Sequence, residues 1–384
     1  MPLRLAGRVS TVAPFLAMEV LERAIVLEAE GAHVVHLEIG EPDLAPPPEA
    51  VEACARALAA GETRYTDSRG LLTLREAIAQ DAACRTGARV DPGQVLVTSG
   101  TSAAMLLVFS LLVSPGDEVI VPTPHYPCYP NFVRVCGGVP VFVPARAEQS
   151  WRVDPAAVRA ALTPRTRAIV LGSPANPTGA VQDRGTIEAL ADLGVPLVSD
   201  EIYGGLVYDG ETSASALSLG RDDVFVLDGV SKRYAMTGFR LGWVVAPAEA
   251  ARPLQVLQQN LFISANRFVQ HAAVAALREG ANTTETMRAA YASRRERLVA
   301  GLRQLGFGVT ALPAGAFYVF ADARAFDADS RRLAFDLLER AHVAVTPGID
   351  FGEAGEGFLR FCYAASESDL ALALERMRGA LRAA

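Results

Sequence analysis

The chain has 384 residues, of which 51% are hydrophobic and 21% are charged, and its net charge is −7. It is long enough for a large core and too long for one ordinary compact domain. The sequence has no basic block, which argues against a nucleic-acid partner, and its longest apolar run, Ala103–Val113, is too short to cross a membrane. Five scattered cysteines without a C-x-x-C pair predict neither a disulfide framework nor a zinc site, so we expect no bound metal and a reducing cytoplasm.

The N-terminal region predicts a helix over Ala17–Glu30, where apolar residues recur at helical spacing, and then a short strand over Val34–Ile39. Gly40 and the prolines at positions 46–48 then break regular structure. We expect the first domain junction here.

The middle of the chain alternates between strand-like and helical patterns. The predicted strands are Val95–Thr98, Glu118–Val121, Val139–Val143, Ala168–Leu171, Pro196–Ser199, Val224–Leu227 and Leu241–Val245. Helical patterns lie between most of them, for example over Leu71–Ala83, Ser102–Leu112, Asp183–Asp192 and Arg267–Leu277. This alternation favours a mostly parallel sheet with helices on both faces. The last two strands lie too close together for a helical crossover, so we expect one of them to run antiparallel.

The pattern changes after about residue 285. We expect, in order, a helix over Thr284–Leu305, strands near Phe307–Ala311 and Phe317–Phe320, a helix over Arg331–Arg340, strands over Val343–Val345 and Gly357–Phe361, and a helix from Ser366. This order favours a smaller α+β domain, on which the N-terminal helix packs. The predicted division is a large α/β domain over residues 46–284 and a discontinuous small domain over residues 1–45 and 285–384.

Polar residues follow four of the predicted strands. They are Ser99–Ser102 after the first strand, Pro174–Gly179 after the fourth, Asp200–Tyr203 after the fifth and Ser231–Lys232 after the sixth. Ligands of open α/β sheets bind beyond the carboxyl ends of the strands. The sequence therefore predicts a binding site at one edge of the sheet.

Lys232 is the most informative of these residues. A lysine after a strand is usually a solvated surface charge, but a desolvated lysine has a lowered pKa and forms a Schiff base with an aldehyde. The hydroxyl of Ser231 and the planar fork of Arg240 suit a phosphate. Gly100, Thr101 and Ser102 open a helix, where N–H groups attract an anion, although an ordinary N-cap is the commoner explanation.

Two charged residues in apolar surroundings need a partner. Asp200 is either a structural cap or ion pair, or the partner of a protonated ring nitrogen, and Glu201 is the competing carboxylate. Arg360 lies in a strand with apolar neighbours, so it either forms a salt bridge within the small domain or binds a ligand carboxylate.

The stretch Gly229–Trp243, with Ser231, Lys232 and Arg240, resembles the lysine signature of pyridoxal 5′-phosphate (PLP) enzymes of fold type I. The likeness is to class I/II aminotransferases, in particular the aspartate aminotransferase-like ones, and extends from Gly40 to Arg360. It implies a large domain with a mostly parallel seven-stranded sheet sandwiched by helices, a smaller α+β domain, and a homodimer with shared active sites.

The resemblance also implies a role for each matching residue. Lys232, Asp200 and Tyr203 are the expected catalytic residues, and Asp200 holds the ring nitrogen of PLP. The remaining expected cofactor contacts are Asn176 and Tyr203 at the ring oxygen, Tyr126 stacked on the ring, and Gly100, Thr101, Ser102, Ser231 and Arg240 around the phosphate. Tyr65 reaches the phosphate of the partner subunit. Gly40, Asn176 and Arg360 bind the substrate, and the Asn176–Pro177 peptide bond is expected to be cis.

The predicted function is the transfer of an amino group between an L-amino acid and a 2-oxo acid. The alternative on the same fold is a PLP-dependent β-lyase or a synthase of cyclic amino acids. Two other classes of protein fit the sequence less well. A transcription regulator would carry a DNA-binding segment in front, and we find no basic recognition helix. A nicotinamide oxidoreductase would carry a G-x-G-x-x-G motif, and we find none after any predicted strand. The substrate side chain stays open: Arg69 and Arg267 are candidate cations for a dicarboxylate, whereas Phe15 and Leu16 would line an apolar pocket.

Overall fold

The structure is a computed structural model that describes residues 3–210 and 213–382. Its largest element is a seven-stranded sheet. In spatial order the strands are β2 (Val95–Thr98), β8 (Gly242–Val245), β7 (Val224–Gly229), β6 (Leu197–Asp200), β5 (Thr166–Gly172), β3 (Glu118–Thr123) and β4 (Val139–Pro144). Neighbouring strands are parallel except at β8, which runs antiparallel to both β2 and β7. This confirms the predicted reversal beside Lys232.

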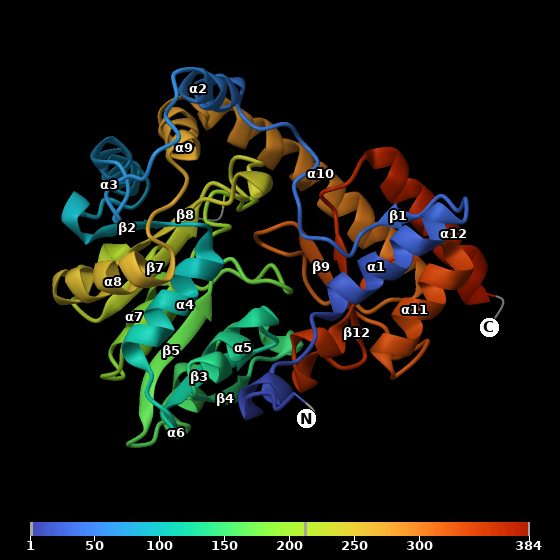
Figure 1. The fold of residues 1–384 in the computed structure, drawn as a ribbon. Coiled ribbons are helices and arrows are strands. Elements are labelled where there is room, and N and C mark those ends of the chain that lie inside the picture. Colours follow the sequence, from blue (N-terminus) through green and yellow to red (C-terminus); the bar gives the residue numbers. More distant parts are fainter. Residues whose placement is uncertain (1–2, 211–212, 383–384) are drawn as a thin grey trace.

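Helices cover both faces of this sheet (Figure 1). One face packs against α4 (Thr101–Leu112), α5 (Cys128–Val135) and α8 (Ala248–Leu261). The other packs against α3 (Leu72–Thr86), α6 (Pro155–Ala160), α7 (Arg184–Ala191) and α9 (Arg267–Glu279), and α2 (Pro48–Ala59) lies against α9. Because both faces are buried, the central strands are apolar along most of their length, as the sequence predicted.

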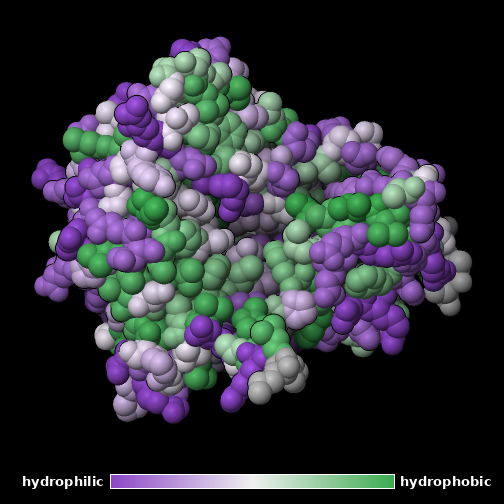
Figure 2. Space-filling view, viewed as in Figure 1, coloured by the Kyte–Doolittle hydropathy of each residue, from purple (hydrophilic) through white to green (hydrophobic). Residues whose placement is uncertain are grey.

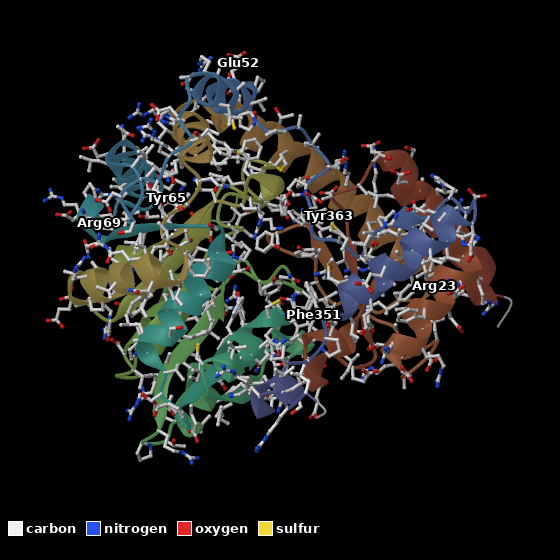
Figure 3. The ribbon with its side chains drawn as sticks, viewed as in Figure 1. Arg23, Glu52, Tyr65, Arg69, Phe351 and Tyr363 are labelled. Carbon is white, nitrogen blue, oxygen red and sulfur yellow. The ribbon has the colours of Figure 1, made fainter. Side chains whose placement is uncertain are left out.

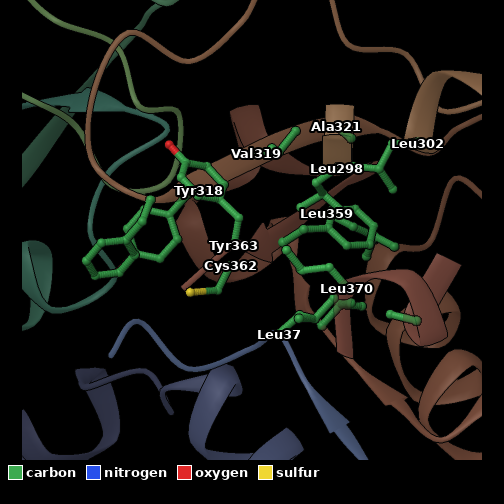
Figure 4. Close-up of a cluster of buried hydrophobic side chains, with 14 of the residues drawn as sticks. Leu37, Leu298, Leu302, Tyr318, Val319, Ala321, Leu359, Cys362, Tyr363 and Leu370 are labelled. Atoms are coloured by element: carbon green, nitrogen blue, oxygen red, sulfur yellow. The ribbon is translucent and has the colours of Figure 1, made fainter. Parts of the chain in front are cut away.

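The C-terminal elements form a second, smaller part. They are α10 (Ala281–Leu305), β9 (Tyr318–Asp322), α11 (Ser330–Ala341), β10 (Val343–Ala344), β11 (Thr346–Pro347), β12 (Phe358–Cys362) and α12 (Glu367–Arg382). Strands β11, β12 and β9 form an antiparallel sheet, and its buried core continues into α10 and α12 (Figure 4).

The N-terminal elements join this smaller part. The helix α1 (Leu16–Ala29) buries Val20, Ala24 and Leu27 against α11 and β10, and β1 (Val35–His36) pairs in parallel with β10. Figure 1 shows these blue segments among the orange and red ones. The predicted boundary at residues 284/285 falls inside α10, and the division into two domains remains our prediction. No helix of the described chain is long and apolar enough to span a membrane.

Three local predictions differ from the structure. The predicted strand Phe307–Ala311 is wrong, because only Gly308 makes an isolated bridge, to Asp322. The strand predicted over Val34–Ile39 is reduced to Val35–His36. The prolines at positions 46–48 do not exclude a helix, because α2 begins at Pro48 and the first helical position tolerates proline.

Candidate active site

A cavity of about 220 Å³ lies between the edge of the large sheet and the smaller part of the molecule. Figure 2, drawn from the same side as Figure 1, shows apolar residues on either side of the hollow between the two parts. The large part lines the cavity with Thr101, Ser102, Tyr126, Tyr129, Asn176, Asp200, Tyr203, Ser231, Lys232 and Arg240. The smaller part contributes Phe15, Met18, Glu38, Gly40, Tyr318 and Arg360.

Each of the four strand ends predicted from the sequence therefore contributes residues to one cavity, although Ser99, Gly100, Thr178, Gly179 and Glu201 do not line it. Strands β2, β5, β6 and β7 point in the same direction, and polar groups that follow each of them line the cavity. Tyr126 follows β3 and reaches the same cavity. The Asn176–Pro177 peptide bond is cis, as predicted.

Lys232 is the only lysine in the sequence. Its Nζ donates a hydrogen bond to the backbone oxygen of Gly40 at 2.5 Å and lies 5.9 Å from the centre of the Phe317 ring. Burial disfavours the charged ammonium and lowers the pKa of Lys232 to about 8. About a tenth of this amine is therefore neutral, and nucleophilic, at pH 7.

Asp200 ends β6 and is 8% exposed. The hydroxyl of Tyr129 donates to its Oδ2 at 2.7 Å, and the N–H of Ile202 donates to its Oδ1 at 3.3 Å. Burial raises the pKa of Asp200 to about 6, although both hydrogen bonds favour the charged form. A cation placed against this carboxylate would keep it ionised.

Glu201, the competing carboxylate, does not line the cavity. It accepts hydrogen bonds from the Ser199 hydroxyl at 2.9 Å and from the Ala216 N–H at 2.8 Å. Consecutive residues at a strand end point to opposite sides, which explains why only the first of the two acids faces the cavity.

Tyr203 is buried, and its hydroxyl lies 2.7 Å from the hydroxyl of Tyr318. Figure 4 shows the hydroxyl of Tyr318 pointing out of the hydrophobic cluster that holds its ring. A side chain at Gly40 would collide with this hydroxyl, so the position requires glycine. Tyr129 and Tyr318 both belong to the site, and the sequence analysis identified neither.

Arg360 is 2% exposed, yet none of its hydrogen bonds within the described chain goes to a carboxylate. Its guanidinium donates to Asn176 Oδ1 at 3.0 Å, to Thr346 Oγ1 at 2.9 Å and to the backbone oxygen of Glu38. Its buried Nε has no partner within the described residues. The salt bridge considered from the sequence is thus not formed, and the unpaired charge faces the cavity.

Gly100 and Arg240 lie together at the start of α4. Gly100 has a φ of 87°, and a Cβ there would lie 2.8 Å from a terminal nitrogen of Arg240. The guanidinium of Arg240 donates a hydrogen bond to the backbone oxygen of Thr237 at 3.0 Å. Thr101 and Ser102 begin the helix beside it. The helix start, two hydroxyls and a guanidinium are suited to an anion.

The aromatic and remote candidates divide into two groups. Tyr126 lines the cavity with its ring centre 6.1 Å from that of Phe15, whereas Leu16 does not line it. Tyr65 is 75% exposed and does not line the cavity of its own chain. Figure 3 shows it on the large part, well away from Tyr363 of the smaller part. A contribution by Tyr65 to a partner's site remains a prediction.

The two candidate cations for a dicarboxylate substrate also lie outside the cavity lining. Arg69 pairs with Asp67 at 3.0 Å, and Arg267 pairs with Glu62. Among the residues that the structure describes, the cations that line the cavity are Lys232, Arg240 and Arg360.

A family model described as aminotransferase class I and II matches residues 32–377. An aspartate/prephenate aminotransferase of Thermus thermophilus is 40% identical over 379 residues, which cover 97% of each chain. A (5-formylfuran-3-yl)methyl phosphate transaminase of Methanocaldococcus jannaschii is 38% identical over 97% of this chain and 98% of the relative. The solved structure of Thermus thermophilus aspartate aminotransferase with maleate aligns with a TM-score of 0.94 at 39% identity, over 99% of this chain and 100% of that one. The chain therefore belongs to the class I and II aminotransferase family, with the fold-type-I architecture predicted from its sequence.

Proposed function

We propose that this chain is a PLP-dependent aminotransferase that moves an amino group between an L-amino acid and a 2-oxo acid. The observation that carries the proposal is that one cavity contains the only lysine of the sequence, a buried aspartate, and a buried arginine that has no acidic partner among the described residues. The printed names of the relatives share transamination and differ in substrate, so we propose the reaction class and not one amino acid.

Three features of the cavity fit the cofactor. Asp200 is a buried carboxylate that forms no ion pair within the described residues, and a protonated ring nitrogen would supply the missing cation. Gly100, Thr101, Ser102, Ser231 and Arg240 would hold the phosphate. Asn176 accepts from Arg360 through its Oδ1, which leaves its N–H groups to join Tyr203 at the ring oxygen.

When bound, PLP supplies an aldehyde for the amino group and a ring that withdraws electrons. Lys232 would hold this aldehyde through its Nζ and, when released from it, would use its neutral amine to take the proton from the α-carbon of the substrate. Asp200 would hold the ring nitrogen in its protonated form, and Tyr126 would contact the ring.

Arg360 would bind the α-carboxylate of the substrate. Its position is fixed by Asn176, Thr346 and the backbone of Glu38, so its remaining N–H groups are oriented before the substrate arrives. A carboxylate would also satisfy the buried Nε.

We further propose a homodimer in which Tyr65 reaches the partner's phosphate site. The high exposure of Tyr65 in a single chain supports this arrangement. We also propose a cytoplasmic location, which rests on the scattered cysteines of the sequence.

The test is amino-group transfer by the purified protein with PLP, a ¹⁵N-labelled amino acid and an unlabelled 2-oxo acid. We expect ¹⁵N in the new amino acid, and its loss in Lys232→Ala. Release of ammonia and pyruvate without transfer would instead support the β-lyase alternative, and transfer at the normal rate by Lys232→Ala would contradict the assignment of the lysine.

A further inference from the structure

Arg233 follows Lys232 directly but points away from the cavity. Its side chain is 5% exposed, and its guanidinium donates two hydrogen bonds to Asp81 of α3, at 3.0 Å and 2.9 Å. The side chains of two consecutive loop residues thus point in different directions: Lys232 lines the cavity, and Arg233 is hydrogen-bonded to α3.

The rest of Arg233 is also held. Its stem packs so closely on Gly205 that a side chain there would collide with it, and its guanidinium lies 4.7 Å from the centre of the Tyr234 ring. The hydroxyl of Thr284 in α10 donates to its backbone oxygen at 2.9 Å. The loop residue next to Lys232 is therefore attached to α3 by its side chain and to α10 by its backbone.

Asp81 extends these contacts to the sheet. It also accepts a hydrogen bond from the guanidinium of Arg85 at 2.9 Å. The same guanidinium donates a hydrogen bond to Asp228 of β7 at 2.8 Å. Burial raises the pKa of Asp81, but the positive charges of Arg233 and Arg85 outweigh this and hold it below its usual value. Two carboxylates thus face two guanidinium groups, and the cluster connects α3, β7 and the lysine loop.

A buried ion pair of this kind adds little net stability compared with apolar side chains of similar volume, because both charges lose their water. Its two parallel hydrogen bonds do, however, allow only one relative geometry of the groups they join. A role in fixing geometry therefore explains the Arg233–Asp81 pair better than a role in stability.

We propose that the Arg233–Asp81 pair is a clamp that positions Lys232, so that its amine stays buried in the cavity and within reach of the Gly40 oxygen. Arg233 is in this sense a positioning residue. The inference deepens the proposed function, since a clamped lysine serves Schiff-base chemistry.

The clamp acts on Lys232 through burial. The other titratable or charged groups that face the amine include Cys362, Glu41, Arg360, Arg240 and Asp200, and burial is the largest influence on its pKa. When the clamp is released, the loop moves and water reaches the amine, so the pKa of Lys232 rises from about 8 towards its ordinary value of 10.5.

The test uses the full chain without added cofactor and measures the labelling of Lys232 by an amine-reactive reagent as a function of pH. Because no other lysine exists, mass spectrometry separates this label from that of the N-terminal amine. The variants are Arg233→Met, Asp81→Asn and the double variant. The matched control is Arg295→Met, since Arg295 is also a fully buried arginine that pairs with an aspartate, Asp209.

We expect the labelling midpoint to rise by about one pH unit or more in both single variants and to stay near 8 in Arg295→Met. The double variant leaves neither charge of the pair behind, so it should regain thermal stability while its midpoint remains high. Midpoints near 8 in every variant, or a double variant that regains both stability and the wild-type midpoint, would overturn the clamp.

The cofactor provides a second measurement. Borohydride trapping of PLP on Lys232 should be slower in Arg233→Met than in Arg295→Met, and equal rates would count against the clamp. Absence of trapping in the wild-type chain would contradict the proposed function instead, whereas the labelling midpoint does not involve the cofactor.

Discussion

The hydrogen bond between Tyr129 and Asp200 offers a quantitative test of the cofactor site. The Tyr129→Phe substitution removes only the hydroxyl that donates to Asp200 Oδ2 at 2.7 Å. A hydrogen bond to a buried carboxylate contributes about 2 kcal/mol, which corresponds to about 1.5 pKa units. The pKa of Asp200 in the cofactor-free chain should therefore rise from about 6 to roughly 7.5.

This shift determines how the loss of affinity depends on pH. Only the ionised carboxylate pairs with a protonated ring nitrogen, so protonation of Asp200 competes with PLP. Linkage then predicts that Tyr129→Phe weakens PLP binding about 4-fold at pH 7, about 15-fold at pH 6 and hardly at all at about pH 9. Lowering the pH enlarges the deficit because the variant protonates first.

Equilibrium dialysis of PLP at these three pH values measures the effect. Tyr363→Phe is the matched control, because it removes a buried hydroxyl that bonds the backbone oxygen of Ala316 and not Asp200. A deficit of the same size at every pH, or an equal deficit in Tyr363→Phe, would refute the reasoning.

Three further predictions concern the other groups of the cavity. Arg360→Lys loses the planar fork, so we expect KM for the amino acid to rise roughly 10- to 100-fold while PLP affinity is unchanged; an unaltered KM would exclude Arg360 as the carboxylate site. Lys232→Met should stabilise the cofactor-free chain by up to about 3 kcal/mol at pH 7. The reason is that burial lowers the pKa of the amine from 10.5 to about 8, so the charged amine costs folding stability in full below pH 8. This gain in denaturant unfolding should disappear as the pH rises above about 10.5, and a gain independent of pH would contradict it. We expect Tyr65→Ala and Lys232→Ala each to be inactive alone. Mixing them should restore up to a quarter of the wild-type activity, because on the order of half of all dimers would be hybrids with one intact site. No recovery after proven subunit exchange would argue against shared sites.

The sequence predicted those parts of the site that depend on strand order alone. Residues after parallel strands meet at one edge of the sheet, so Asn176, Asp200 and Lys232 could be brought together without knowing any distance. The roles assigned to them still depend on the family resemblance and on the experiments above.

The residues that the sequence analysis did not identify depend on long-range packing. Tyr318 comes from β9 and reaches Tyr203 only because the smaller part packs against the edge of the large sheet. Tyr129 follows Tyr126 by three residues, which puts their ring centres 5.4 Å apart, but its contact with Asp200 requires the orientation of α5 on the sheet. The local sequence around Tyr129 does not predict how α5 is oriented on the sheet.

The wrong strand has a similar physical cause. Residues 307–311 have an apolar pattern, but a strand also needs a partner along its length, and here only Gly308 finds one. The function of Arg233 was likewise hidden, because its partner Asp81 lies far away in the sequence.

The central claim is that Lys232 binds PLP, and it can be measured directly. The full chain is incubated with PLP, reduced with borohydride and digested, and its peptides are mapped by mass spectrometry. The account predicts one stoichiometric modification, on the peptide that contains Lys232. An unmodified Lys232 peptide, with label only at the N-terminal amine, would contradict it.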